Sequence, residues 1–213
     1  ERKKNLLALI EEKINNLGFR ETYYQYSNLV IRELIANAII HQDLSILGNQ
    51  IKIEFYENRI EISNPGTPII DVWRFYDTNR TRNLKLASNM NKFGICEELG
   101  SGIDKIVEIS EIEKRFTPQY IIYDGQYTTV KLFRNREFEN MSEDEKLNIL
   151  YYHCCYSYTL EKYMTNSSLR ERFMLNNTNA DSKKITRLIN KALSYNLIKQ
   201  GVNKTYIPFW GYC

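Results

Sequence analysis

Glu33, Asn37 and His41 recur every four residues in the segment RELIANAIIHQD, residues 32–43. A helix turns by about 100° per residue, so these three side chains share one stripe of a predicted helix. Most of their neighbours are apolar: Leu34, Ile35, Ala36, Ala38, Ile39 and Ile40. A carboxylate can orient or deprotonate a water, and an amide oxygen suits Mg²⁺. The stripe therefore predicts a polar site beside a buried helix; the alternative is a buried hydrogen-bond pair, with His41 as a helix cap rather than a base.

Two turns could complete a nucleotide site around that stripe. Asn64-Pro65-Gly66 follows a predicted strand, and Gly100-Ser101-Gly102 precedes a predicted helix, whose exposed N–H groups favour anions. Between them, Arg80 and Arg82 are candidates for phosphate contacts from a mobile loop. The alternatives are plain turn chemistry for the glycines and a solvated surface for the arginines.

The elements that must position these residues follow from periodicity. Residues 3–17 have apolar side chains at helical spacing and predict an N-terminal helix, and Ser27 is a candidate N-cap for the helix of the polar stripe. Residues 51–63 alternate as a hairpin with its turn at Glu57-Asn58, and residues 119–133 form a second hairpin with its turn at Asp124-Gly125. We therefore expect an α+β fold with helices on one face of a mostly antiparallel sheet.

Composition and charge divide the 213 residues into two regions. Residues 1–139 hold 19 Lys/Arg and 20 Asp/Glu, whereas residues 140–213 hold 10 and 6, so the basic part is C-terminal. We predict a domain of residues 1–139, with its N-terminal helix, and a second domain of residues 140–213. No apolar run approaches the length of a membrane span, and the four cysteines lack C-x-x-C spacing, so we expect a cytoplasmic protein with reduced thiols.

The second region has the order helix, helix, helix, hairpin, and its third helix is basic. This order is the plan of a winged helix-turn-helix, and residues 143–210 resemble that class of domain. Polar and basic residues on the open face of the third helix, together with the hairpin loop, are the candidate DNA contacts: Lys183, Lys184, Thr186, Arg187, Asn190, Lys191 and Lys204. The alternative is a surface for protein contacts. His153 has no partner at ligand spacing and is interpreted as structural.

Four motifs in order carry a resemblance to a known family: RELIANAIIHQDLS, IKIEFYENRIEISNPG, NRTRN and FGICEELGSGIDKI. Residues 27–134 resemble the ATP-binding domain of bacterial proteins named RecG-like or "divergent AAA". That domain is a remote relative of the gyrase, Hsp90, histidine-kinase and MutL (GHKL) ATPases. The resemblance implies a GHKL-like α/β sandwich that binds ATP and Mg²⁺.

The resemblance also assigns roles to residues of this chain. Glu33 takes the place of the catalytic base, and Asn37 that of the Mg²⁺ ligand. Asn64 and Gly66 stand at the adenine-recognising Asp-x-Gly motif, while Gly100, Ser101 and Gly102 stand at the phosphate-cradling turn. The chain departs from the pattern, because Asn64 replaces the Asp and Thr67-Pro68 follow Gly66 where a second glycine is expected. At most weak ATP hydrolysis is therefore implied, and helicase activity is not, because no G-x-x-x-x-G-K-[ST] occurs.

The combined expectation is a bacterial transcriptional regulator in which nucleotide modulates DNA binding by a winged helix. Relatives of this kind usually carry an AlbA-like nucleic-acid-binding domain upstream, so we expect one to be missing from a chain that opens ERKKNLLALI without Met. Homo-oligomer formation stays open. Two alternatives remain: a slow Mg²⁺-dependent ATPase, and a binding module whose nucleotide site has decayed.

Overall fold

The computed structural model describes residues 10–14, 20–96, 100 and 102–212, with backbone only for residues 10–14 and 20–23. The chain divides into two compact units. The first contains the described residues up to Val72, then Asn79–Ile106 and Pro118–Asn135; the second contains Trp73–Thr78, Val107–Thr117 and the residues from Arg136 onward. The interpretation of residues 1–139 and 140–213 as functional domains stays a prediction.

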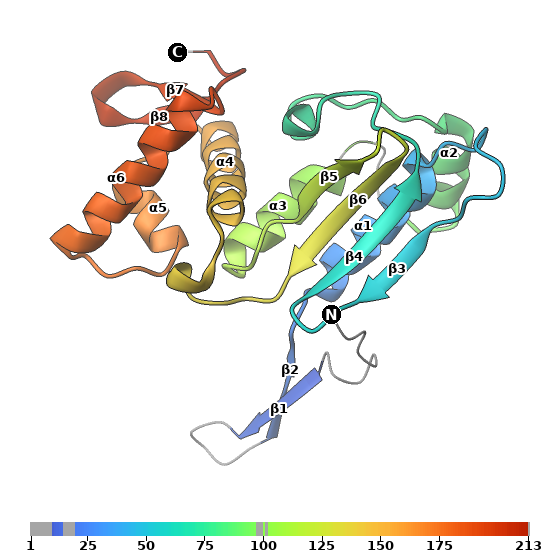
Figure 1. Ribbon diagram of the computed structural model, residues 1–213, viewed down its shortest axis with the longest axis horizontal. Helices are drawn as coiled ribbons and strands as arrows, with labels where there is room; N and C mark the ends of the chain where they lie inside the picture. The colour runs from blue at the N-terminus through green and yellow to red at the C-terminus, as the bar shows by residue number, and fades with distance from the viewer. Residues whose placement is uncertain (1–9, 15–19, 97–99, 101, 213) are drawn as a thin grey trace. The chain divides into compact units, whose positions relative to one another are not determined.

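A four-stranded antiparallel sheet forms the centre of the first unit, with strand order β3-β4-β6-β5 (Figure 1). Its strands are β3 (Lys52–Phe55), β4 (Arg59–Pro65), β5 (Gln119–Tyr123) and β6 (Tyr127–Phe133). Ile60 pairs with Leu132 and Ile62 with Val130, and all four side chains are buried. The two predicted hairpins are confirmed with their turns, because alternating apolar residues and Asp124-Gly125 agree on one register.

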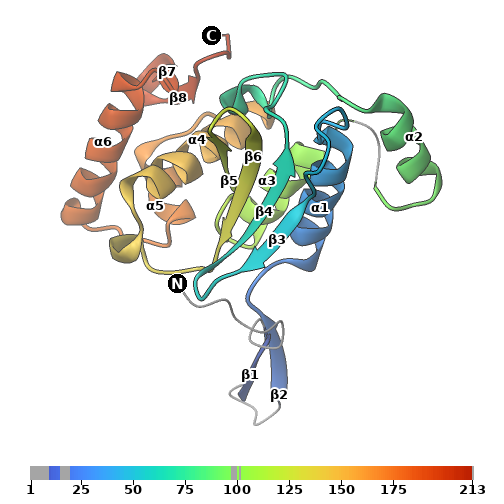
Figure 2. The same cartoon turned by 45° about the vertical axis from the view of Figure 1, so that its right-hand side comes forward.

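Helix α1 (Asn28–His41) packs on the face of the sheet that carries the buried isoleucines of β4 (Figure 2). Ser27 occupies its N-cap position, although its side chain makes no capping hydrogen bond. Helix α3 (Gly102–Ile112) begins at the predicted glycine turn. The expected α+β arrangement of helices with an antiparallel sheet is therefore confirmed.

Two segments differ from the sequence-based expectation. The predicted helix over residues 3–17 is wrong for residues 10–14, which form strand β1 (Ile10–Ile14) paired antiparallel with β2 (Arg20–Tyr24). A lone amphipathic helix is marginal unless its apolar face packs, whereas a local hairpin satisfies the backbone groups of both strands. Helix α2 (Leu84–Lys92) was not anticipated, although Leu86, Ala87 and Met90 have helical spacing.

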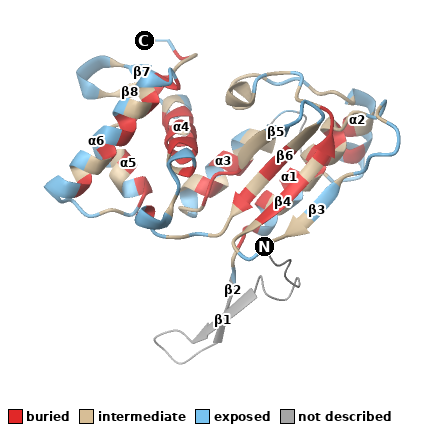
Figure 3. Ribbon diagram, in the orientation of Figure 1, coloured by how far each residue is buried: buried red, intermediate tan, exposed pale blue. Residues whose placement is uncertain are grey.

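The second unit consists of helices followed by a two-stranded hairpin. Its elements are α4 (Glu143–Thr159), α5 (Asn166–Arg172), α6 (Asn179–Ser194), β7 (Ile198–Gln200) and β8 (Tyr206–Pro208), with short 3₁₀ turns η3 (Phe138–Asn140) and η4 (Val202–Lys204). A further 3₁₀ turn, η2 (Val72–Arg74), begins at the last residue of one segment of the first unit and continues into the second. Helix α4 begins with a capping box between Ser142 and Glu145, and most of its length is buried (Figure 3). Within the described ranges, none of the helices combines the length and the apolar character needed to cross a bilayer.

Candidate functional site

Glu33 and Asn37 lie one turn apart on α1, as the four-residue spacing predicts. Glu33 is 3% exposed as a whole residue, and its Oε1 accepts a hydrogen bond from Arg32 Nη2 at 2.9 Å. The Nδ2 of Asn37 is buried and has no hydrogen-bond partner among the residues that the structure describes. Leaving a buried amide donor unpaired costs on the order of 1–3 kcal/mol, so an unpaired amide is an unusual feature of a helix in a core.

Gly102, the first residue of α3, meets both side chains. A Cβ at this position would lie 3.3 Å from Asn37 Oδ1 and 3.7 Å from Glu33 Oε2. The first turn of α3 carries backbone N–H groups that have no partner within the helix. An amide oxygen and a carboxylate oxygen therefore both lie near the first residue of α3, where glycine avoids a tight contact with Asn37 Oδ1.

The residues before Gly102 are partly described. Gly100 has φ +106°, and a Cβ there would lie 1.7 Å from Asn79 Nδ2, so a side chain at this position is excluded. Ser101 lies outside the described residues. Asn79 was given no role in the sequence analysis; its place as the first residue of the motif NRTRN was the available signal.

Gly66 lies at a junction of backbone segments at the end of β4. Its φ is +96°, and a Cβ there would lie 2.6 Å from Asp43 Cβ and 2.9 Å from Arg82 Nη1. The Gly66 N–H donates to the carbonyl of Gln126 at 2.7 Å, and the Asp43 N–H donates to the carbonyl of Pro65 at 2.8 Å. The close approach of Asp43 and the positive φ therefore require glycine at this position.

Arg80 and Arg82 have different surroundings. Arg82 donates to Asp43 Oδ2 at 2.8 Å and also to the carbonyl of Thr67, whereas Arg80 is exposed. The next residue, Asn83, donates through Nδ2 to the carbonyls of Ile40 and Gln42, both at 2.8 Å, and thereby holds the C-terminal end of α1. Arg82 is thus held in an ion pair, and Arg80 is the arginine whose side chain extends into solvent.

Asn64 on β4 and His41 at the end of α1 are the two remaining polar residues named in the sequence analysis of this site. Asn64 is 7% exposed and lies two residues beyond Ile62 on β4. Every second residue of a strand points to the same face, so Asn64 shares the helix-covered face of Ile60 and Ile62. Burial lowers the pKa of His41, and the positive charge of Arg82 lowers it further. Both effects favour the neutral form of the His41 imidazole.

The candidate DNA contacts form two groups on α6. Lys183, Arg187 and Asn190 are exposed and lie three to four residues apart, so they form one stripe, which we call the outer stripe. Lys184 donates to Glu139 at 2.8 Å and to Asp181 at 3.1 Å, and Lys191 donates to Glu143.

The two remaining candidates are also exposed. Thr186 donates through Oγ1 to the Ser182 carbonyl at 2.9 Å, and it accepts from Asn166 Nδ2 at 3.0 Å. Lys204 is exposed in η4, between the two strands of the hairpin. Among the candidate DNA contacts, Lys183 and Arg187 of the outer stripe and Lys204 are thus exposed cations, whereas Lys184 and Lys191 bind acids of their own unit.

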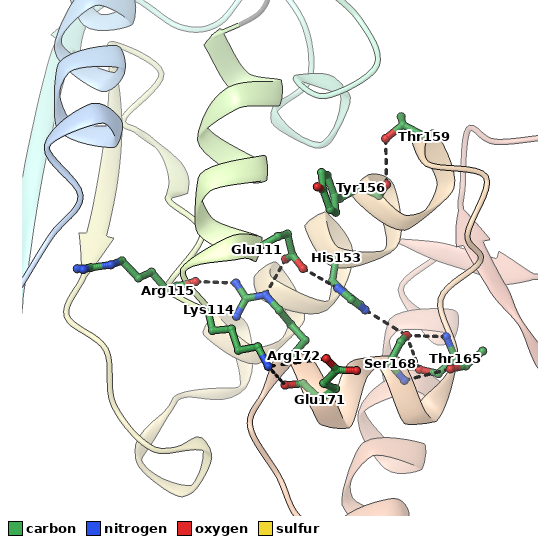
Figure 4. Close-up of polar contacts among 10 residues, drawn as sticks. All are labelled: Glu111, Lys114, Arg115, His153, Tyr156, Thr159, Thr165, Ser168, Glu171 and Arg172. Atoms are coloured by element: carbon green, nitrogen blue, oxygen red, sulfur yellow. Dashed lines mark hydrogen bonds and ion pairs between the residues drawn. The ribbon is translucent and has the colours of Figure 1, made fainter.

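A second buried acid lies in the C-terminal unit (Figure 4). Glu111 Oε2 lies 2.7 Å from His153 Nδ1, and Glu111 Oε1 accepts from Arg172 Nε at 2.7 Å. His153 Nε2 lies 3.1 Å from Ser168 Oγ, so acid, imidazole and hydroxyl follow one another in the order of a hydrolase triad. The hydroxyl, however, is a member of the capping box of α5 with Thr165, and Arg172 compensates the acid. This cluster therefore serves the fold, in line with the structural interpretation of His153.

Residues 48–132 match the family model described as "Putative ATP-dependent DNA helicase recG C-terminal". This match confirms the resemblance for that part of the chain. The crystal structure of the DIP2311 protein from Corynebacterium diphtheriae is similar, with a TM-score of 0.55 and 14% identity, over 93% of this chain and 42% of that chain. At this identity the likeness shows the fold alone, and the chain spans less than half of that protein's length. No curated protein matches the chain.

Proposed function

We propose that the first unit, which holds most of residues 48–132, is a GHKL-like domain that binds ATP, and that the helices and hairpin after residue 140 form a winged helix that binds DNA. The observation that carries the proposal is the convergence of Glu33 Oε2 and Asn37 Oδ1 on Gly102 at the start of α3. The family model supports the nucleotide as ligand, because its description names an ATP-dependent protein.

The residues present fit Mg²⁺ bound together with a nucleotide. Mg²⁺ prefers hard oxygen ligands and usually keeps several waters, so one or two protein oxygens and the phosphates suffice. Asn37 Oδ1 would hold the ion, and the unpaired Nδ2 of the same amide would donate to a phosphate oxygen or a water. When bound, Mg²⁺ supplies positive charge that compensates the phosphates.

The other site residues take roles from their positions. The N–H groups at Gly102 would donate to phosphate oxygens, and Arg80, exposed before α2, would compensate their charge. Asn64, buried beside the Gly66 turn, would accept from an adenine amino group. Arg82 acts by holding Asp43 and the Thr67 carbonyl, so its contribution is to keep the Gly66 turn in place.

In the proposed winged helix, α6 is the recognition helix and the outer stripe faces the DNA. Lys183 and Arg187 would contact phosphates or base edges, Asn190 would read an edge, and Lys204 in the hairpin loop would contact the backbone. Lys184 and Lys191 contribute less, because their ammonium groups are held by Glu139, Asp181 and Glu143. Nucleotide modulates DNA affinity only if it binds the two states of the protein with different affinity.

The nucleotide site is tested by calorimetric titration of the purified chain with ATP, with and without Mg²⁺. We expect Mg²⁺-dependent binding that Asn37→Ala abolishes and that Asn89→Ala, at an exposed position of α2, leaves unchanged. A folded wild-type protein that takes up no ATP would favour the alternative of a decayed site.

The DNA surface is tested with two double variants that remove the same charge from the same helix. We expect Lys183→Ala with Arg187→Ala to weaken binding to duplex DNA about tenfold or more and to reduce its salt dependence. Lys184→Ala with Lys191→Ala should have a smaller effect. Equal losses from both pairs would count against the outer stripe as the contact surface.

A slow ATPase is the second candidate function, because Glu33 keeps a carboxylate oxygen toward Gly102. Phosphate release that Glu33→Gln abolishes would support it.

A further inference from the structure

Helix α3 is shared by the two compact units. Its first part, Gly102–Ile106, belongs to the first unit, and its second part, Val107–Ile112, belongs to the second. One ladder of backbone hydrogen bonds runs through both parts. A ligand that binds the N–H groups at Gly102, where the proposed function places the phosphates, therefore binds an element that continues into the second unit.

The second part of α3 ends in a buried anchor, the hydrogen bonds of Glu111. Its Oε1 accepts from Arg172 Nε of α5 at 2.7 Å, and its Oε2 lies 2.7 Å from His153 Nδ1 of α4. Arg172 Nη2 also donates at 2.6 Å to the carbonyl of Arg115, which follows α3 (Figure 4). The side chains of Glu111 and Arg172 are 6% and 4% exposed, so solvent screens this ion pair little. The end of α3 is thus fixed to α4 and α5.

The anchor continues to α6, the proposed recognition helix. Ser168 Oγ, 3.1 Å from His153 Nε2, belongs to the capping box at the start of α5. From the same turn of α5, Asn166 Nδ2 donates to the Ser182 carbonyl and to Thr186 Oγ1 of α6, both at 3.0 Å. A shift at the end of α3 therefore reaches α6 through hydrogen-bonded side chains that all belong to the second unit.

We propose that α3 couples the two proposed binding sites: ATP bound at Gly102 changes the DNA affinity of α6 through the Glu111 anchor. The proposal rests on the ATP and DNA binding proposed above. The free N–H groups of a helix point along its axis, so a phosphate bound to them restrains the position and direction of the whole helix. The anchor transfers this restraint to α5 and α6. Such coupling is reciprocal, so DNA changes ATP affinity by the same factor.

The test measures the Kd of the full chain for a fluorescently labelled DNA duplex, with and without saturating ATP, at the same Mg²⁺ concentration and ionic strength. The ratio of the two Kd values is the coupling factor. For the wild type we expect the two Kd values to differ about fivefold or more. Calorimetric titration with ATP, with and without the duplex, should give the same factor.

Glu108 is exposed near the point where α3 passes from the first unit to the second, and it offers a matched pair of variants. Glu108→Gly and Glu108→Ala remove the same carboxylate, but only glycine adds backbone freedom to the helix interior. We expect Glu108→Ala to keep the wild-type coupling factor and Glu108→Gly to bring it below about twofold. Both variants should bind ATP alone and DNA alone as the wild type does. Equal coupling in the two variants would contradict α3 as the connection.

The anchor is tested by Glu111→Gln, which removes the charge that holds Arg172. We expect its coupling factor to fall close to one at a temperature where circular dichroism shows the variant folded. Ser142→Ala is the control, because it removes the capping box of α4 and destabilises the same unit without a change in α3. Loss of coupling in Ser142→Ala as well would contradict the anchor. If Glu111→Gln does not fold, the two Glu108 variants decide.

A second segment of the second unit, Trp73–Thr78, is the competing connection, because it lies in the chain between Gly66 and Asn79 of the first unit. The Tyr151 hydroxyl donates to the carbonyl of Trp73. Tyr151→Phe removes this hydrogen bond and should leave the coupling factor unchanged. If Tyr151→Phe abolishes the coupling and the α3 variants keep it, the proposal is wrong.

The outcomes separate the coupling from the function on which it rests. If the wild type binds ATP and duplex DNA but neither ligand changes the affinity for the other, the coupling through α3 is wrong and both binding proposals stand. If the wild type binds no ATP or no DNA, that part of the proposed function fails and the coupling fails with it.

Discussion

Glu33 and Glu111 are both buried glutamates, with side chains 4% and 6% exposed, yet the two units surround them differently. Glu111 receives His153 on one oxygen and Arg172 on the other. Among the described residues, Glu33 has one ion-pair partner, Arg32, which takes one oxygen and leaves the other toward Gly102. Asn37, whose Nδ2 is unpaired among the described residues, has its amide oxygen 3.3 Å from the same Cβ position of Gly102.

If the proposed function holds, the difference separates an acid that holds a fold together from one whose set of partners a ligand completes. A buried carboxylate must have partners, because an isolated charge in a core costs far more than a fold can supply. Where the protein provides partners for both oxygens, as at Glu111, the partners themselves depend on the acid. Where one oxygen and a neighbouring amide remain available at a helix N-terminus, as at Glu33, a ligand can complete the set.

The largest expected effect is on the stability of the C-terminal unit. Glu111→Gln leaves the buried guanidinium of Arg172 without its counter-charge, and we expect a loss of about 3 kcal/mol in the free energy of unfolding. Urea unfolding followed by circular dichroism measures it. Glu171→Gln is the control, because its side chain is 79% exposed and 3.9 Å from Lys114 Nζ, and it should cost less than about 0.5 kcal/mol. Equal losses would mean that the Glu111 cluster adds little to the fold.

Lowering the pH should reduce the stability of the wild type more than that of Glu111→Gln. Burial alone would raise the pKa of Glu111, but the hydrogen bond from His153 and the charge of Arg172 outweigh it and hold this pKa below its ordinary value. The stability from the ionised acid is therefore fully present above the ordinary carboxyl range and is lost as pH falls through the lowered pKa. Urea midpoints from about pH 6 to about pH 3 should fall more steeply for the wild type than for Glu111→Gln. If the urea midpoints of the two proteins fell in parallel with pH, the Glu111 cluster would not be the source of the acid sensitivity.

Two asparagines extend the comparison to neutral groups. Asn148 Nδ2 donates to the carbonyl of Thr117 at 2.9 Å and Asn148 is 5% exposed, so Asn148→Ala should cost about 1–2 kcal/mol. Asn37→Ala removes an amide whose Nδ2 is unpaired among the described residues, and it should cost less than about 0.5 kcal/mol while abolishing ATP binding. Thermal or urea unfolding of both variants measures these losses in the free energy of unfolding. A large loss of stability at Asn37 without loss of a ligand would favour a structural amide.

The smallest expected effect on stability is at the glycine that meets the polar stripe. Gly102→Ala places a methyl group 3.3 Å from Asn37 Oδ1, so ATP affinity should fall about tenfold, with less than about 0.5 kcal/mol lost from the fold. Gly125→Ala is the control, because nothing lies within 4 Å of a Cβ there. The φ of +64° is unfavourable for alanine, so this substitution affects the free energy of unfolding alone. It should lower stability and leave ATP affinity unchanged. Unaltered ATP binding by Gly102→Ala would place the ligand elsewhere.

Much of the fold was predictable because its signals are local. The alternation of Ile60 and Ile62 and the Asp-Gly turn specified the hairpins, and the four-residue spacing placed Glu33 and Asn37 on one helix face. The N-terminal helix was mispredicted over Ile10–Ile14, because the pairing of β1 with β2 satisfies backbone groups through a partner strand that helical spacing does not reveal. Local spacing likewise grouped Lys184 and Lys191 with the outer stripe, although acids distant in sequence hold them.

The sequence by itself determined the polar stripe, the two glycine turns, the antiparallel hairpins and the basic third helix, because each depends on residues close in the chain. Only the tertiary structure decided which of these groups meet. It brought Gly102 to Asn37 and Glu33, paired Arg82 with Asp43, and satisfied Glu111 with Arg172. The physical reason is that a buried polar group takes whichever partner packing delivers, and that partner is 39 residues away for Arg82 and 61 for Arg172.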